Sequence, residues 1–174
     1  RVERETEMRL DDPAWNNLDT FNPHAPPIPH QIEQFRNYAK SGGRLSNNDD
    51  SCWTDLFECL VHQSSMLPSS YAAFPHLVDI AEEFPCVRPE ILAFSLDMED
   101  NPEGLFDSLN VEIGTSLDRI RKWAIDTIRT LSPFHIDDGY LPYLLAAFAR
   151  LSDSHSFWAQ ELQHLGSNGS EVWA

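Results

Sequence analysis

Two cysteines and a histidine are spaced so that they could bind a soft metal ion. Cys52, Cys59 and His62 stand at positions i, i+7 and i+10 of one predicted helix and therefore share a face. His76 or Cys86 would supply a fourth ligand. However, the chain has no Cys-x-x-Cys pair, and the same face carries the apolar stripe of the helix. We therefore expect core cysteines and a hydrogen-bonded histidine, with no metal and no cofactor.

His62 and Gln63 stand at the predicted C-terminal end of the same helix. A histidine there donates to unpaired carbonyls and interacts favourably with the helix dipole. Catalysis would instead need a nucleophile or a second titrating group aimed at the histidine, and the nearby serines lack the glycines of a nucleophile elbow. We expect a structural histidine and a chain that is not an enzyme. An enzyme with a site near His62, Tyr71 and His76 is the alternative.

Acidic residues are concentrated in the middle of the chain. The formal net charge is −16, and residues 45–118 contain fifteen Asp and Glu against one basic residue, Arg88. Such a charge disfavours direct binding of nucleic acid, because phosphate contacts depend on Lys and Arg. A block of one sign is either a solvated surface or a docking face for a basic partner. The partner-binding acids that we expect in this segment are Asp49, Asp50, Glu82, Glu83, Asp97, Glu99, Asp100 and Glu103.

The cysteines, histidines and central acids must be positioned by the helices around them, and the clearest of these is a helical pair that covers residues 52–84. Apolar residues recur at three- and four-residue spacing on each side of a break at residues 64–70. The first stripe contains Trp53, Leu56, Phe57, Leu60 and Val61, and the second contains Tyr71, Phe74, Leu77, Val78 and Ala81. Because neither helix can bury its stripe alone, we expect the two to face each other, with further helices on both sides.

The rest of the chain is also predicted to be helical. Helices are expected at about 28–40, 89–98, 116–131, 140–151 and 154–165, with a short one near Trp15, and Ser41-Gly42-Gly43 is expected to end the first of these. The first is expected to bury Ile32, Phe35, Tyr38 and Ala39, and the third is expected to bury Leu117, Ile120, Trp123, Ala124, Ile128 and Leu131. Residues 22–29 hold four prolines and predict a stiff connector, and Gly114 predicts a break. Period-two alternation is essentially absent, so no strand is expected. The sequence predicts seven or eight helices in a single domain, 1–174, with frayed ends at 1–12 and 166–174.

An apolar-Pro-x-x-apolar pattern recurs at three predicted helix starts, which begin at Ile28, Phe74 and Leu141. The prolines of the first two copies are 46 residues apart, which is near the period of HEAT-type helix pairs. The prolines of the second and third copies are 67 residues apart, which is not a simple multiple of that period. Proline also favours the first turn of any helix. We expect an all-α fold of HEAT-like stacked helix hairpins. An irregular helical bundle is the alternative.

The central stretch carries a more specific pattern. Trp53-x-x-Leu56 is followed by Leu60-Val61-His62-Gln63 and then by Ser70-Tyr71-Ala72-Ala73-Phe74-Pro75-His76-Leu77-Val78. This resembles the signature "W-x-x-L … HQG … SYAA-x-P-x-L" of bacterial HEAT-repeat-like proteins, over about a fifth of the chain. Ser64 stands where that signature has glycine, so the turn is expected to differ. Some acidic, all-helical proteins of this general type look like immunity proteins of bacterial toxin systems.

This resemblance and the charge together predict a non-enzymatic binding protein. We expect an immunity protein that neutralises a cognate basic toxin domain by covering its active surface. A scaffold or adaptor protein, with acids that serve solubility, is a further alternative. Three cysteines without tight spacing fit a reducing cytosol, no signal peptide is visible, and no apolar run approaches the roughly 18 residues of a membrane span. The expected location is therefore the cytoplasm, without a membrane partner.

Overall fold

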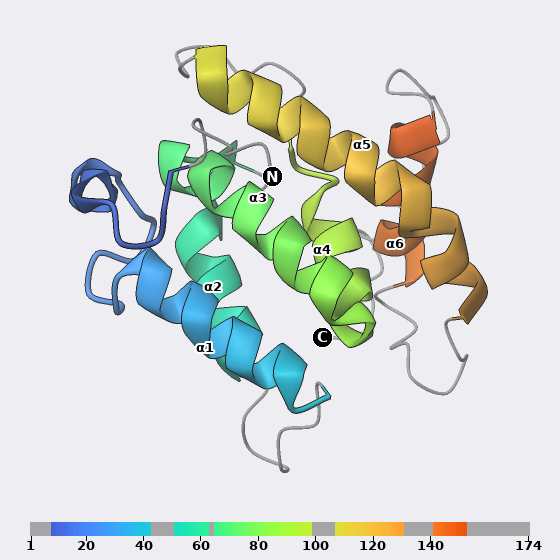
Figure 1. The fold of residues 1–174 in the computed structure, drawn as a ribbon, viewed down its shortest axis with the longest axis horizontal. Helices are drawn as coiled ribbons and strands as arrows, with labels where there is room; N and C mark the ends of the chain where they lie inside the picture. Colours follow the sequence, from blue (N-terminus) through green and yellow to red (C-terminus); the bar gives the residue numbers. More distant parts are fainter. Residues whose placement is uncertain (1–7, 43–50, 63–64, 99–106, 131–140, 153–174) are drawn as a thin grey trace, which may run out of the picture. The chain divides into compact units, whose positions relative to one another are not determined.

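The computed structural model describes residues 8–42, 51–62, 65–98, 107–130 and 141–152 (Figure 1). In these ranges nearly all regular structure is helical, which confirms the all-α class. The six α-helices of the described ranges are α1 (Ile28–Lys40), α2 (Ser51–Leu60), α3 (Pro68–Glu83), α4 (Arg88–Phe94), α5 (Asp107–Thr130) and α6 (Leu141–Ser152). Two short 3-10 helices, η1 (Pro13–Asn17) and η2 (Pro85–Val87), complete the helical part. The helix predicted at 154–165 lies outside the described residues.

The chain divides into two compact units, which are described separately. The first contains Arg1–Val87 and Asp97–Ser116, and the second contains Arg88–Leu96 and Leu117–Ala174. Helix α5 therefore contributes residues to both. The expectation of a single domain stays a prediction. None of the helices in the described ranges combines the length and the apolar run that crossing a bilayer requires.

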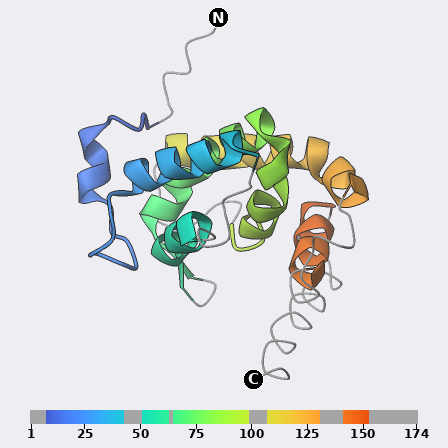
Figure 2. The ribbon, with the colours of Figure 1, turned by 90° about the horizontal axis from the view of Figure 1, so that it is seen from below.

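Helix α1 is the centre of the first unit, because both α2 and α3 pack against it. Figure 1 shows α1 and α3 side by side with α2 behind them, and in Figure 2 α2 lies below α1. Of the four buried positions expected in α1, Ile32, Phe35 and Ala39 are at most 1% exposed, whereas Tyr38 is only half-buried. The predicted stripe of α3 is also confirmed, since all five of its residues are buried. The main packing partner of both central helices is α1, which corrects the expectation that they chiefly face each other.

A small antiparallel hairpin joins α2 to α3. Strands β1 (Val61–His62) and β2 (Ser65–Met66) pair in the register Val61↔Met66 and His62↔Ser65. The expectation of no strand is therefore wrong for these four residues. Two-residue strands are too short to produce a period-two pattern, which is why the sequence did not reveal them.

The same hairpin corrects the predicted end of α2, which stops at Leu60 and not at Gln63. The carbonyl of Leu60 accepts a hydrogen bond from Ser70 Oγ at 2.5 Å, and the carbonyl of Cys59 accepts one from the Phe21 N–H at 3.1 Å. These donors satisfy groups that a helix end leaves open. His62 is exposed, and its ring lies 5.7 Å from that of Phe21. It therefore does not cap α2 in the way the sequence predicted.

Two further boundaries differ from the predicted ones. Pro75 lies in the interior of α3, because Pro68 already occupies the first turn of that helix. The apolar-proline pattern at Phe74 thus does not mark a helix start. Gly114 lies inside α5, where Ile113, Leu117 and Ile120 continue one buried face across it. Burial along this face outweighs the modest cost of a glycine within a helix.

The second unit is held by α4, α6 and residues 117–130 of α5. Helix α4 packs against α6. Arg121 Nε donates to the carbonyl of Leu151 at 2.9 Å, and an Arg150 guanidinium nitrogen donates to the carbonyl of Leu96. Arg88 lies over the ring of Trp123 at 5.3 Å from its centroid. The buried positions predicted for the helix at 116–131 are confirmed in α5 where burial is described, since Leu117, Ile120, Trp123 and Ala124 are at most 6% exposed.

Gly42 and Gly114 form a matched pair for a stability measurement. Gly42 ends α1 with a φ of +88°, as the predicted glycine cap requires, and its N–H donates to the Ala39 carbonyl at 3.0 Å. A Cβ at either glycine would meet no atom within 4 Å. We expect Gly42→Ala to lower the free energy of unfolding by about 1 kcal/mol and Gly114→Ala to raise it by about 0.5–1 kcal/mol in urea unfolding. Shifts of the same sign would contradict one of the two backbone assignments, and reversed signs would contradict both.

Candidate functional site

Three of the predicted partner-binding acids lie in the described residues. Glu82 and Glu83 are exposed at the C-terminal end of α3. Glu83 Oε2 lies 3.0 Å from Arg36 Nη1 on α1, so part of its charge is neutralised within the first unit. Asp97 follows α4 and is half-buried. The structure therefore brings Glu82 and Glu83 together at one helix end and shields Asp97.

The other five predicted acids, which are Asp49, Asp50, Glu99, Asp100 and Glu103, lie outside the described residues. Their assignment to a binding surface stays a prediction.

Two carboxylates that sequence reasoning did not select are presented by α2. Asp55 and Glu58 are exposed and stand one helical turn apart, on the side opposite Leu56 and Leu60. No Lys or Arg of the described residues forms an ion pair with either of them. The helical period of the α2 stripe could have identified this pair, because residues off the stripe point to solvent.

A half-buried glutamate, Glu90, is found in the second unit. Desolvation by burial raises the pKa of Glu90 above its ordinary value of 4.5, and a backbone hydrogen bond opposes part of that shift. Glu90 Oε2 has no hydrogen-bond partner among the described residues. Burial disfavours the charged form of such a group.

The candidate metal ligands do not form a metal centre in the described part of the chain. His62 has left the helix that carries Cys52 and Cys59, so the shared face that the sequence predicted does not exist. Cys59 is buried and its Sγ accepts from Gln31 Nε2 at 3.4 Å, whereas Cys86 is exposed and donates to the Ala39 carbonyl at 3.3 Å. Within the described ranges no three His, Cys, Asp or Glu side chains gather as a metal site would require.

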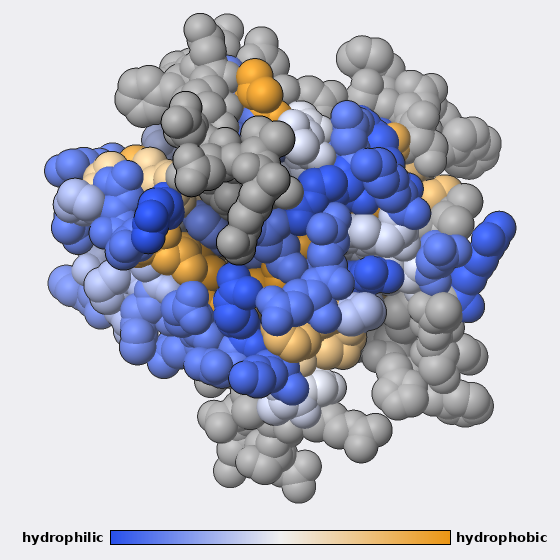
Figure 3. All heavy atoms as spheres, in the orientation of Figure 1, coloured by the Kyte–Doolittle hydropathy of each residue, from blue (hydrophilic) through white to orange (hydrophobic). Residues whose placement is uncertain are grey.

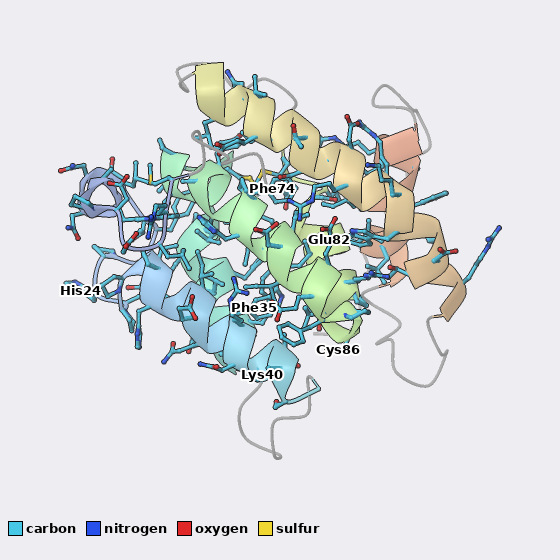
Figure 4. All side chains as sticks on the ribbon, in the orientation of Figure 1. His24, Phe35, Lys40, Phe74, Glu82 and Cys86 are labelled. Atoms are coloured by element: carbon cyan, nitrogen blue, oxygen red, sulfur yellow. The ribbon has the colours of Figure 1, made fainter. Side chains whose placement is uncertain are left out.

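A groove of about 620 Å³ lies between the N-terminal segment and the beginning of α1. Its walls come from residues between Leu10 and His30, with Ser69 contributed by α3. Figure 4 shows this segment beside α1, with His24 at its outer edge. The wall includes five prolines: Pro13, Pro23, Pro26, Pro27 and Pro29. The predicted connector at 22–29 is thus one side of a concave surface, which the sequence did not indicate.

Buried polar side chains of α1 and α3 hold the wall of this groove in place. Gln31 Nε2 donates to the carbonyl of Pro26 at 2.6 Å, and Ser69 Oγ donates to the carbonyl of Asp19 at 2.6 Å. Gln31 is 3% exposed and Ser69 is fully buried. Each hydrogen bond fixes an irregular segment to a helix, so the groove is formed before any ligand arrives.

The N-terminal end of the same segment is held in a similar way. His76 Nε2 lies 2.7 Å from the carbonyl of Met8, and Trp15 Nε1 donates to the carbonyl of Arg9 at 2.9 Å. The rings of Trp15 and His76 are 6.1 Å apart. His76 therefore fastens a segment 68 residues away in sequence, a role that no local pattern could have predicted.

The comparisons with known proteins add no relative to this picture. No family model, no curated protein and no solved structure matches the chain. The resemblance to HEAT-repeat-like proteins therefore stays a prediction, and functional inference depends on the geometry and charge described above.

Proposed function

We propose that this chain is a non-enzymatic binding protein built from HEAT-like stacked helix pairs. The arrangement of α1 and α3 supports this. Arg36 near the end of α1 pairs with Glu83 at the end of α3, and Cys86 Sγ donates to Ala39 at the end of α1. The two helices therefore run in the same direction, with α2 in a second layer (Figures 1 and 2). Equivalent helices of successive HEAT-type repeats are related in this way.

The partner that we propose is a basic protein, bound through the acidic middle of the chain. The single observation that carries this proposal is the pair of exposed carboxylates on α2, Asp55 and Glu58, with which no described Lys or Arg forms an ion pair. Figure 3 shows hydrophilic side chains over most of the described surface in that view. Exposed, unpaired charges accelerate encounter with an oppositely charged protein and disfavour wrong partners.

As in the sequence-based prediction, the partner would be a toxin domain, which a cytoplasmic immunity protein neutralises by occlusion. Carboxylates of this chain would pair with Lys and Arg that the toxin uses on its own substrate. The large net charge of −16 and the all-helical fold support this assignment. A scaffold with acids that serve solubility is the rival, and the two differ in how binding responds to salt.

The test begins with the product of the gene directly upstream, co-expressed and co-purified with this chain. We expect co-expression to protect cells, and we expect raising NaCl from about 50 mM to about 500 mM to weaken the complex about tenfold or more. The double variant Asp55→Asn/Glu58→Gln should weaken it about three- to thirtyfold by calorimetry, because two charged pairs at an interface contribute roughly that much.

The matched control, Glu33→Gln/Asp126→Asn, removes two exposed charges outside the acidic middle and should change the affinity less than twofold. A tight complex that is indifferent to both salt and the Asp55/Glu58 change would contradict electrostatic docking. A neighbouring product that kills cells whether or not this chain is present would contradict the immunity role.

A further inference from the structure

The groove at the N-terminal segment is rich in hydrogen-bond acceptors, although Asn16, Thr20 and His30 also bring donors to its wall. Five of its lining residues are prolines, which have a backbone carbonyl and no N–H. The carboxylates of Asp11 and Asp12 also line it, and none of its lining residues in the described part of the chain is Lys or Arg. A ligand that brings donors and positive charge therefore complements this surface, whereas an anionic ligand would be repelled by the two carboxylates.

The two carboxylates of the groove differ in what already binds them. Asp11 is paired with Arg9, with 3.0 Å between Oδ1 and Nε, and this pair is largely exposed. Asp12 Oδ1 accepts the Ala14 N–H at 2.8 Å as the cap of η1. No Lys, Arg or His among the described residues pairs with Asp12. The second carboxylate oxygen of Asp12 is thus the group in the groove that can accept a hydrogen bond from a cationic ligand.

We propose that this groove receives an arginine side chain from an extended segment of the basic protein partner. The guanidinium group has five N–H donors and no acceptor, and it is more weakly hydrated than an ammonium group, so it complements an acceptor-rich wall. A volume of about 620 Å³ lies in the usual range of ligand sites and exceeds one side chain, which leaves room for flanking residues. Gln31 and Ser69 have already fixed the wall, which lowers the cost of ordering it on binding.

The proposal rests on the proposed function, but a peptide tests it without the partner. The probe is the capped tripeptide acetyl-Gly-Arg-Gly-amide, titrated into the ¹⁵N-labelled full chain, with the indole N–H resonance of Trp15 as the reporter. We expect saturable shifts at Trp15 and at backbone amides of residues 10–30. The citrulline peptide, which has the same shape without the charge, should produce no such shifts at the same concentration.

Asp12→Asn is the matched variant, because asparagine caps a helix as well as aspartate but carries no charge. We expect it to weaken binding of the arginine peptide about five- to tenfold, which is the loss of one charge-assisted hydrogen bond. Asp55→Asn/Glu58→Gln should leave peptide binding unchanged. Equal shifts with the citrulline peptide, undiminished binding by Asp12→Asn, or shifts spread over the acidic helices would each overturn the groove assignment.

These outcomes separate the two proposals. In one outcome, the arginine peptide fails to bind the groove while the partner complex still depends on salt and on Asp55 and Glu58. In that case the groove assignment fails and the proposed function stands. If the peptide binds the groove while the partner complex is indifferent to salt and to those carboxylates, the proposed function fails and the arginine site stands.

Discussion

Replacing Phe35 by alanine should destabilise the first unit by about 3–5 kcal/mol, the usual cost of truncating a fully buried phenylalanine. Phe35 has no exposed surface and lies between α1 and α3 in Figure 4. Its ring is 5.0 Å from that of Trp53 on α2, so one side chain joins the centre of this unit to its second layer. Urea unfolding followed by circular dichroism measures the loss, which is comparable to a large part of the stability of a small domain.

Phe21→Ala is the matched control, because it removes the same atoms from a half-buried position. The Phe21 ring contacts exposed His62, and its backbone N–H keeps its bond to Cys59 in the variant. We expect this change to lower the free energy of unfolding by about 1 kcal/mol. A Phe35→Ala variant that loses no more than Phe21→Ala would show that α1 is not the element on which α2 and α3 pack.

The apolar period predicted the helices of the first unit well. Ile32, Phe35 and Ala39 were identified from spacing alone, and a glycine cap was expected within Ser41-Gly42-Gly43, because these features depend on residues within a few turns of one another. Gly114 and Pro75 were misinterpreted as a helix break and a helix start, because their outcome depends on tertiary packing and not on neighbouring residues. Glycine disfavours a helix interior by about 1 kcal/mol and proline by about 3 kcal/mol, and tertiary burial of the surrounding face outweighed both penalties.

The candidate binding surfaces were less accessible to sequence reasoning. The charge block located the acidic middle, but it did not separate Glu83, which pairs with Arg36, from Asp55 and Glu58, with which no described Lys or Arg pairs. The groove was missed altogether. Its wall exists because Gln31 and Ser69 bind carbonyls of an irregular segment, and backbone carbonyls are the same in every residue type. Nothing in a one-dimensional pattern marks which of them will be bound.

The two surfaces of the first unit would contribute differently to binding. Exposed carboxylates on α2 act over roughly a Debye length and mainly raise the rate of association. A concave site that takes one side chain acts at contact distance and mainly slows dissociation. A partner with an arginine near a wider basic surface would use both, which is why the peptide and the salt titration measure separate quantities.

Replacing Ser70 by alanine should destabilise the first unit by roughly 2–3 kcal/mol, the cost of leaving one buried and one half-buried backbone group without partners. Ser70 Oγ donates to the carbonyl of Leu60 at 2.5 Å and accepts the N–H of Leu67 at 3.1 Å. One hydroxyl thus forms a hydrogen bond with the last residue of α2 and another with the residue that precedes the first turn of α3. Urea unfolding measures the loss, and hydrogen exchange should show faster exchange for the Leu67 amide.

Ser41→Ala is the control, because Ser41 Oγ also donates to a helix carbonyl, that of Tyr38 at 2.7 Å, but in an exposed position. Water replaces that bond in the variant, so we expect a change within about 0.5 kcal/mol. Equal effects of the two substitutions would mean that Ser70 is not buried between the helices. A large effect confined to Ser70 would give the serine of the Ser70-Tyr71-Ala72-Ala73 pattern a physical role. In a stacked helix pair, a small hydroxyl residue can satisfy both helix ends where their backbones approach closely, whereas a larger side chain would hold them apart.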